Sequence, residues 1–137
     1  MTDTLLFEKH KNGVAQITFN RPQAMNALNL ATMRDFADTV NDLAKDTDLR
    51  AVILTGAGDN AFCSGGDLYE LSRFPTEEDA RSFITVMGDA LLMLERLPVP
   101  VIAAINGYAL GGGSEIAVAC DMRIVDEKAR MGFVQIR

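Results

Sequence analysis

Hydrophobic and polar positions first alternate over residues 5–20, LLFEKHKNGVAQITFN, on both sides of the pair Asn12-Gly13. This pattern predicts two short strands joined as a β-hairpin. Over residues 26–45 the apolar side chains return at intervals of three and four, which predicts an amphipathic helix. Residues 50–58, RAVILTGAG, form an apolar run that predicts a buried strand ending in a glycine loop.

A second helix is predicted to begin at the capping-box-like residues 76–79, Thr-Glu-Glu-Asp, and to end before Pro98. Further along, the pattern predicts a buried strand over 98–105, a short apolar helix over 114–120, and a strand, a turn and another strand over 122–133. This alternation predicts an α/β fold with a largely parallel sheet and crossover helices. We expect one domain over 1–137, and the abrupt stop after a strand-like stretch leads us to expect a fragment.

Composition then limits the classes of function. The 137 residues carry a net charge of −6 and no Lys/Arg-rich block, which argues against nucleic acid as a partner. Two cysteines, Cys63 and Cys120, and the single histidine, His10, are too few for a Cys/His metal site. We interpret both cysteines as packing residues, with a disulfide or a nucleophilic role as minor alternatives. We expect neither a signal peptide nor a membrane span, and a reduced, cytoplasmic setting.

Two buried strands run into glycine-rich loops, in AVILTGAGDNAFCSGGDL (51–68) and in VIAAINGYALGGGSE (101–115). Ligands bind at the carboxyl ends of strands in open α/β sheets, and helix N-termini add unpaired N–H groups and a positive dipole end. Glycine lets a ligand approach the backbone without meeting a Cβ. We therefore interpret the two loops as donors of one oxyanion hole, with Glu115 as a candidate general base.

Each of these features also has a simpler interpretation. A glycine run is most often a tight turn or a close helix contact, and Glu115 alone is typical of a solvated carboxylate in a first helical turn. Ser64 and Ser114 lack a GxSxG frame, and the GxGxxG and GxxxxGK[ST] motifs are missing. A Ser-His-Asp triad, a dinucleotide site and a P-loop are therefore not indicated.

Three blocks of the sequence together resemble the crotonase superfamily, the enoyl-CoA hydratase/isomerase family. They are FNRPQAMNAL (19–28), AVILTGAGDNAFCSGGDL (51–68) and PVPVIAAINGYALGGGSEIAVACDMRIVDEKARMGF (98–133), and their order and spacing are specific. The resemblance implies the N-terminal half of a crotonase-like fold, a spiral of repeated ββα units. Members of the family are usually about twice as long, with C-terminal helices that build homotrimers or hexamers (dimers of trimers); we expect those helices to be absent here.

The resemblance also implies site residues. An acyl-CoA thioester would bind with its carbonyl oxygen held by the N–H groups of Gly66 and Gly112, which would stabilise an enolate. Coenzyme A is then part of the substrate, so no separate cofactor and no metal are implied. The further residues expected to lie along the substrate and its coenzyme A are Ala24, Met25, Ser64, Gly65, Asp67, Leu68, Tyr108 and Gly111.

In the hydratases of this family two glutamates, twenty positions apart, flank the substrate double bond. The first matches Glu115, and the second falls on Gln135. Glutamine can orient a water molecule but cannot exchange a proton at neutral pH. The alternatives are a hydratase with Glu115 as sole acid/base, a decarboxylase of a malonyl-CoA-type thioester, and a thioester hydrolase or an isomerase. A CoA-ester binding protein without turnover is the alternative from another class.

Overall fold

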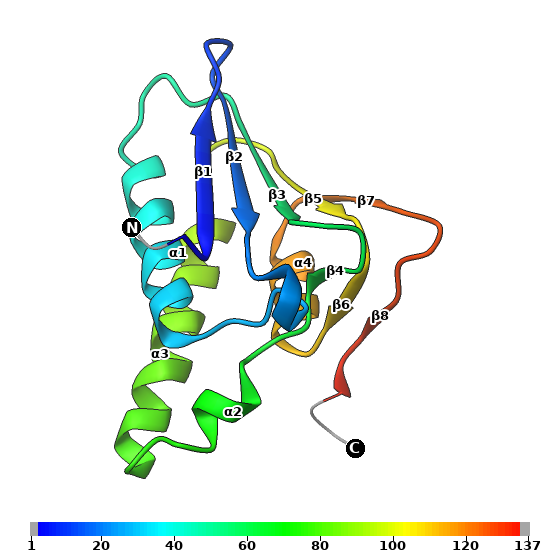
Figure 1. The fold of residues 1–137 in the computed structure, drawn as a ribbon. Coiled ribbons are helices and arrows are strands. Elements are labelled where there is room, and N and C mark those ends of the chain that lie inside the picture. Colours follow the sequence, from blue (N-terminus) through cyan, green and yellow to red (C-terminus); the bar gives the residue numbers. More distant parts are fainter. Residues whose placement is uncertain (1–2, 135–137) are drawn as a thin grey trace.

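Five strands form the larger of two sheets in the computed structural model, which describes residues 3–134 (Figure 1). In spatial order they are β1 (Leu5–Lys9), β2 (Val14–Phe19), β3 (Ala51–Gly56), β5 (Val101–Ile105) and β7 (Met122–Val125). β1 and β2 make the predicted antiparallel hairpin, and the remaining neighbours pair in parallel. The hairpin turn spans residues 10–13 rather than two residues, and Gly13 takes φ +88° there.

A second sheet consists of three short parallel strands, β4 (Ala61–Cys63), β6 (Tyr108–Leu110) and β8 (Met131–Gly132). The strand pairs β3/β4, β5/β6 and β7/β8 each give one strand to either sheet. A helix follows each of the first two pairs, which is the repeated ββα order that the resemblance implies. The prediction from periodicity of one largely parallel sheet is wrong, because β4 and β6 leave the larger sheet and pair with each other.

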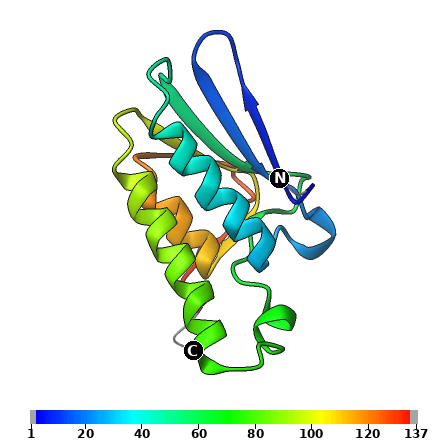
Figure 2. The same cartoon turned by 90° about the vertical axis from the view of Figure 1, so that its left-hand side faces the viewer.

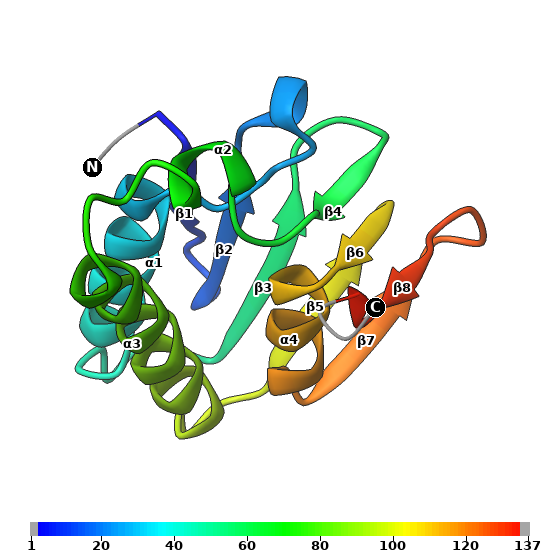
Figure 3. The same cartoon turned by 90° about the horizontal axis from the view of Figure 1, so that it is seen from below.

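The helical segments are η1 (Pro22–Ala24), α1 (Leu30–Leu43), α2 (Leu68–Leu71), α3 (Glu77–Glu95) and α4 (Gly112–Ala119). Helices α1 and α3 pack side by side against one side of the molecule (Figure 2). Helix α4 lies against β4 and β6 and contacts α3, as the view from below shows (Figure 3). The short sheet and α4 therefore share one contact surface. Among the described residues, no helix is long and apolar enough to cross a bilayer.

Two helices begin at other residues than the sequence predicts. Helix α1 begins at Leu30 instead of Asn26, because Asn29 caps it by accepting a hydrogen bond from the Thr32 N–H (2.8 Å). Asn26 lies in the left-handed region (φ 55°), and its amide donates to Ala61 O at 2.8 Å. Helix α4 begins at Gly112 instead of Ser114, so its first turn starts inside the second glycine loop.

The hydrophobic core fixes the strand that leads into the first glycine loop. The Phe19 ring of β2 lies 5.7 Å from Phe36 of α1 and 5.8 Å from Phe62 of β4, measured between ring centroids. All three side chains are fully buried. Burying such a side chain contributes about 1.5–3 kcal/mol, so this cluster ties β4 to both the large sheet and α1.

Candidate active site

Strands β4 and β6 are parallel neighbours, so the loops at their carboxyl ends emerge at the same edge of the short sheet. The first loop holds Gly65, with φ +98°, and the second holds Gly111, with φ +52°. A Cβ on Gly65 would lie 2.9 Å from Leu110 O and 3.1 Å from Gly112 N. The two glycine loops therefore touch through their backbones, and a side chain at position 65 would separate them.

The two N–H groups in question, those of Gly66 and Gly112, are oriented by the carbonyls of the same peptide units. Because a peptide is planar and trans, its N–H points opposite to its C=O. The carbonyl of Gly65 accepts from Leu28 N–H at 2.8 Å, and that of Gly111 accepts from Glu115 N–H at 3.1 Å. Within residues 3–134, neither the Gly66 N–H nor the Gly112 N–H has a hydrogen-bond acceptor. Both are donors available to a ligand.

A pocket of about 610 Å³ opens where the two loops meet. Eight residues of the predicted site line it: Ala24, Ser64, Gly65, Gly66, Asp67, Leu68, Gly111 and Gly112. The sequence reasoning missed three others: Ala27, Leu71 and Val134. Leu71 could have been found from its spacing, since it follows Asp67 by one turn of α2, whereas Ala27 and Val134 reach the pocket only through the fold.

The other predicted site residues lie near this pocket or outside the described range. Met25 contacts the first loop through its carbonyl, which accepts from Ser64 N–H (3.1 Å), but its side chain does not line the pocket. Tyr108, in β6, is 44% exposed and also lies off the described lining. Glu115 is half-buried in the first turn of α4, three residues after Gly112, and is likewise not among the described lining residues. Gln135 lies outside the described residues.

The sequence model of the family described as enoyl-CoA hydratase/isomerase matches residues 9–137. The chain belongs to the enoyl-CoA hydratase/isomerase family. It is 43% identical over 134 residues to the short-chain-enoyl-CoA hydratase of Clostridium acetobutylicum, covering 98% of this chain and 51% of that protein. It is 36% identical over 126 residues to the ethylmalonyl-CoA decarboxylase of Xenopus laevis, covering 92% of this chain and 42% of that protein.

The crotonase-like fold is shared with solved members of the enoyl-CoA hydratase/isomerase family. The crystal structure of an enoyl-CoA hydratase from Bacillus anthracis matches with a TM-score of 0.89 at 40% identity, over 94% of this chain and 50% of that one. The chain thus spans about half the length of the relatives it matches. Among the described residues, no group of three or more His, Cys, Asp or Glu side chains is placed to hold a metal ion.

In this member of the enoyl-CoA hydratase/isomerase family, one ion pair lies beside the first loop. Arg21 Nη2 lies 3.0 Å from Asp67 Oδ2, and each side chain is only 17% exposed. Partial burial raises the pKa of the Asp67 carboxyl, but the hydrogen bond from Glu70 N–H and the Arg21 guanidinium outweigh it. The net pKa of Asp67 is therefore below its ordinary value, and the carboxylate stays charged beside Gly66 at neutral pH.

Both cysteines are free and buried, and burial raises the pKa of each thiol to about 12. Since the thiolate is the reactive form, we expect neither Cys63 nor Cys120 to react with iodoacetamide in the folded protein at pH 8. Both should react in 6–8 M urea, where unfolded thiols return to a pKa of about 8.5. Mass spectrometry of the labelled protein measures this; rapid labelling of one thiol under native conditions would restore it as a candidate nucleophile.

Proposed function

We propose that this chain forms the thioester-binding part of an acyl-CoA enzyme of the enoyl-CoA hydratase/isomerase type. The observation that carries the proposal is the pair of unpaired N–H groups, on Gly66 and Gly112, at the junction of two touching loops beside one pocket. Both would donate to the thioester carbonyl oxygen, where negative charge develops when an enolate forms. A donor of this kind contributes about 3–4 kcal/mol of transition-state stabilisation.

The remaining predicted residues of the pocket would hold the rest of the acyl-CoA. Ala24, Ser64 and Leu68 offer a mixed apolar and polar wall along the first loop, at the place where the coenzyme A moiety is expected. Coenzyme A arrives as part of the substrate, so the proposed chemistry needs no resident cofactor. Assembly into homotrimers or hexamers and a cytoplasmic location stay predictions of the family resemblance.

For hydration of an enoyl thioester, the proposed proton route runs through Glu115 alone. Its carboxylate would take a proton from water as the oxygen attacks Cβ, and the electron pair of the double bond would move onto the thioester oxygen. The enolate, held by the two N–H groups, would then receive the proton from Glu115 at Cα. Gln135 can orient the water through its amide but cannot carry the proton.

Decarboxylation is the second candidate, and the glutamine at position 135 favours it. Loss of CO₂ from a malonyl-type thioester leaves its electron pair in the enolate, so a second carboxylate is not needed to remove a proton. The matched Xenopus laevis relative is named an ethylmalonyl-CoA decarboxylase, and it aligns with 92% of this chain. A thioester hydrolase, an isomerase or a non-catalytic CoA-ester binding protein would use the same donors with a different proton route or none.

A product assay separates these reactions. The protein is incubated with crotonoyl-CoA and, separately, with ethylmalonyl-CoA, and the products are identified by mass. We expect crotonoyl-CoA to gain one water; loss of CO₂ from ethylmalonyl-CoA instead would identify the decarboxylase. Binding of both thioesters without any product would support a binding protein, and the absence of both binding and turnover would overturn the proposed function.

A further inference from the structure

The Gly66 N–H lies at the end of a chain of hydrogen-bonded peptide groups. Gly66 N–H and Gly65 C=O belong to one peptide unit, and that carbonyl accepts from Leu28 N–H at 2.8 Å. Leu28 N–H belongs in turn to the same peptide unit as Ala27 C=O. On the return side of this isolated bridge, Asp67 N–H donates to Leu28 O at 2.9 Å. The direction of the Gly66 N–H is therefore set by the Leu28 segment.

A guanidinium stands at the far end of this chain. Arg21 Nη1 donates to Ala27 O at 2.8 Å, while its Nη2 pairs with Asp67 Oδ2 at 3.0 Å. One planar side chain thus joins both sides of the bridge on which Gly66 lies. The Arg21 backbone is itself fixed, because its N–H donates to the side chain of Asn26 at 2.8 Å.

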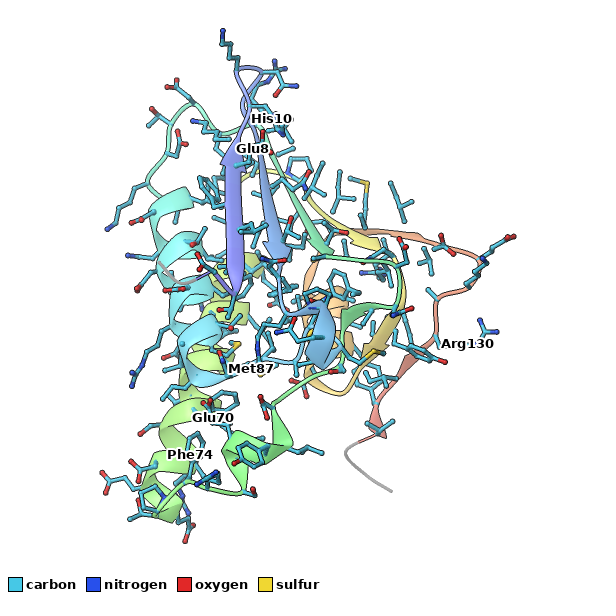
Figure 4. All side chains as sticks on the ribbon, in the orientation of Figure 1. Glu8, His10, Glu70, Phe74, Met87 and Arg130 are labelled. Carbon is cyan, nitrogen blue, oxygen red and sulfur yellow. The ribbon has the colours of Figure 1, made fainter. Side chains whose placement is uncertain are left out.

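The other carboxylate oxygen of Asp67 fastens the same assembly to the helices. Asp67 Oδ1 accepts from Glu70 N–H at 3.2 Å and caps α2. Glu70 points away from α2 toward the long helices (Figure 4), and its Oε1 accepts from Leu30 N–H at the start of α1 (2.6 Å). The Arg21 guanidinium is therefore held against rigid elements instead of on a mobile loop.

We propose that Arg21 is a positioning residue that orients and polarises the Gly66 N–H through two peptide groups. The chain runs from the guanidinium to Ala27 C=O, from Leu28 N–H to Gly65 C=O, and from Gly66 N–H to the ligand oxygen. Hydrogen bonds in such a chain polarise one another, and a cation at the donor end strengthens each of them. Arg21 is not among the described residues that line the pocket, so it acts without touching substrate. The inference rests on the proposed function, since it concerns the same donor.

Arginine and lysine differ in this role. The guanidinium presents separate nitrogens to Ala27 O and to Asp67, in a planar fork. A lysine ammonium keeps the charge but lacks this fixed two-pronged geometry. Arg21→Lys should therefore retain part of the effect, and Arg21→Met, which fills similar space without charge or donors, should lose it.

The test reads the thioester carbonyl directly. Butyryl-CoA labelled with ¹³C at the thioester carbonyl binds without an enoyl double bond to hydrate, and difference infrared spectroscopy gives its carbonyl frequency. We expect the wild-type protein to shift this frequency below that of free butyryl-CoA, Arg21→Met to lose most of the shift, and Arg21→Lys to keep part of it. For crotonoyl-CoA, Arg21→Met should lower kcat about 10²-fold, the cost of losing or misplacing a donor, with little change in KM.

Arg81→Met is the matched control, because it removes the guanidinium of an exposed ion pair with Glu77 on α3. It should leave the carbonyl frequency and kcat at their wild-type values. Wild-type protein that binds butyryl-CoA without shifting its carbonyl would overturn the proposed oxyanion hole. A wild-type shift that survives in full in Arg21→Met, or in Arg21→Lys where Arg21→Met does not fold, would overturn the role of Arg21 and leave the oxyanion hole standing.

Discussion

Replacement of Glu115 by glutamine is expected to lower kcat for crotonoyl-CoA hydration by about 10²–10⁴-fold and to leave KM nearly unchanged. Glutamine keeps the shape of the side chain but cannot accept the proton of the attacking water. Glu115 lies in the first turn of α4, three residues beyond Gly112, so the substitution leaves both donor loops in place. Steady-state kinetics with crotonoyl-CoA measures the change.

Glu78→Gln is the matched control for this variant. Glu78 also lies in the first turn of a helix, α3, and its side chain is exposed. Both substitutions remove one negative charge near a helix N-terminus, so both forgo the same dipole interaction of about 0.3–1 kcal/mol. Wild-type kcat in Glu115→Gln, or equal losses in the two variants, would remove Glu115 from the mechanism. Decarboxylation of ethylmalonyl-CoA should suffer less than hydration, because departure of CO₂ forms the enolate without a base.

Helix α3 shows how much of the fold local sequence predicts. The Thr76 side chain accepts from Asp79 N–H at 3.2 Å, as the capping-box pattern indicates. The predicted stripe is buried at Phe83, Met87 and Leu94. Cap and stripe are both written within a few residues of each other, so neighbouring residues alone determine them.

The parts that sequence reasoning missed depend on partners far along the chain. Strands β4 and β6 have three residues each, too few for a period to appear, and they exist because they pair with each other and with β8. Asn26 fits the helical pattern by spacing, but its side chain bonds Ala61 O, 35 positions away, and this holds its backbone out of the helix.

The candidate site divides in the same way. Glycine loops after two apolar runs are visible in the sequence, and the structure brings them into contact at Gly65 and Gly112. The Arg21–Asp67 pair is not visible, because charged residues far apart in the sequence give no local signal that they meet. The role of Gln135 stays a prediction, since that residue lies outside the described range.

Replacement of Gly113 by alanine is expected to destabilise the fold by about 3 kcal/mol or more, the upper range for overpacking a core. Helix propensity alone predicts the reverse, because alanine is favoured over glycine inside a helix by about 1 kcal/mol. The close approach of α4 to β4 decides the sign. A Cβ at position 113 would lie 1.9 Å from Cys63 O and 2.7 Å from Cys63 C, so a strand backbone would have to move.

Gly88→Ala provides the comparison, since Gly88 is an exposed residue inside α3 and a Cβ there would have no neighbouring atom within 4 Å. It should raise the free energy of unfolding by about 0.5–1 kcal/mol. Urea denaturation measures both variants, with the slope checked for constancy so that midpoints report stability. A Gly113→Ala protein as stable as the wild type would mean that α4 and β4 can separate freely. Because Cys63 ends the strand that leads into Ser64–Asp67, such freedom would also contradict a fixed spacing between the two donor loops.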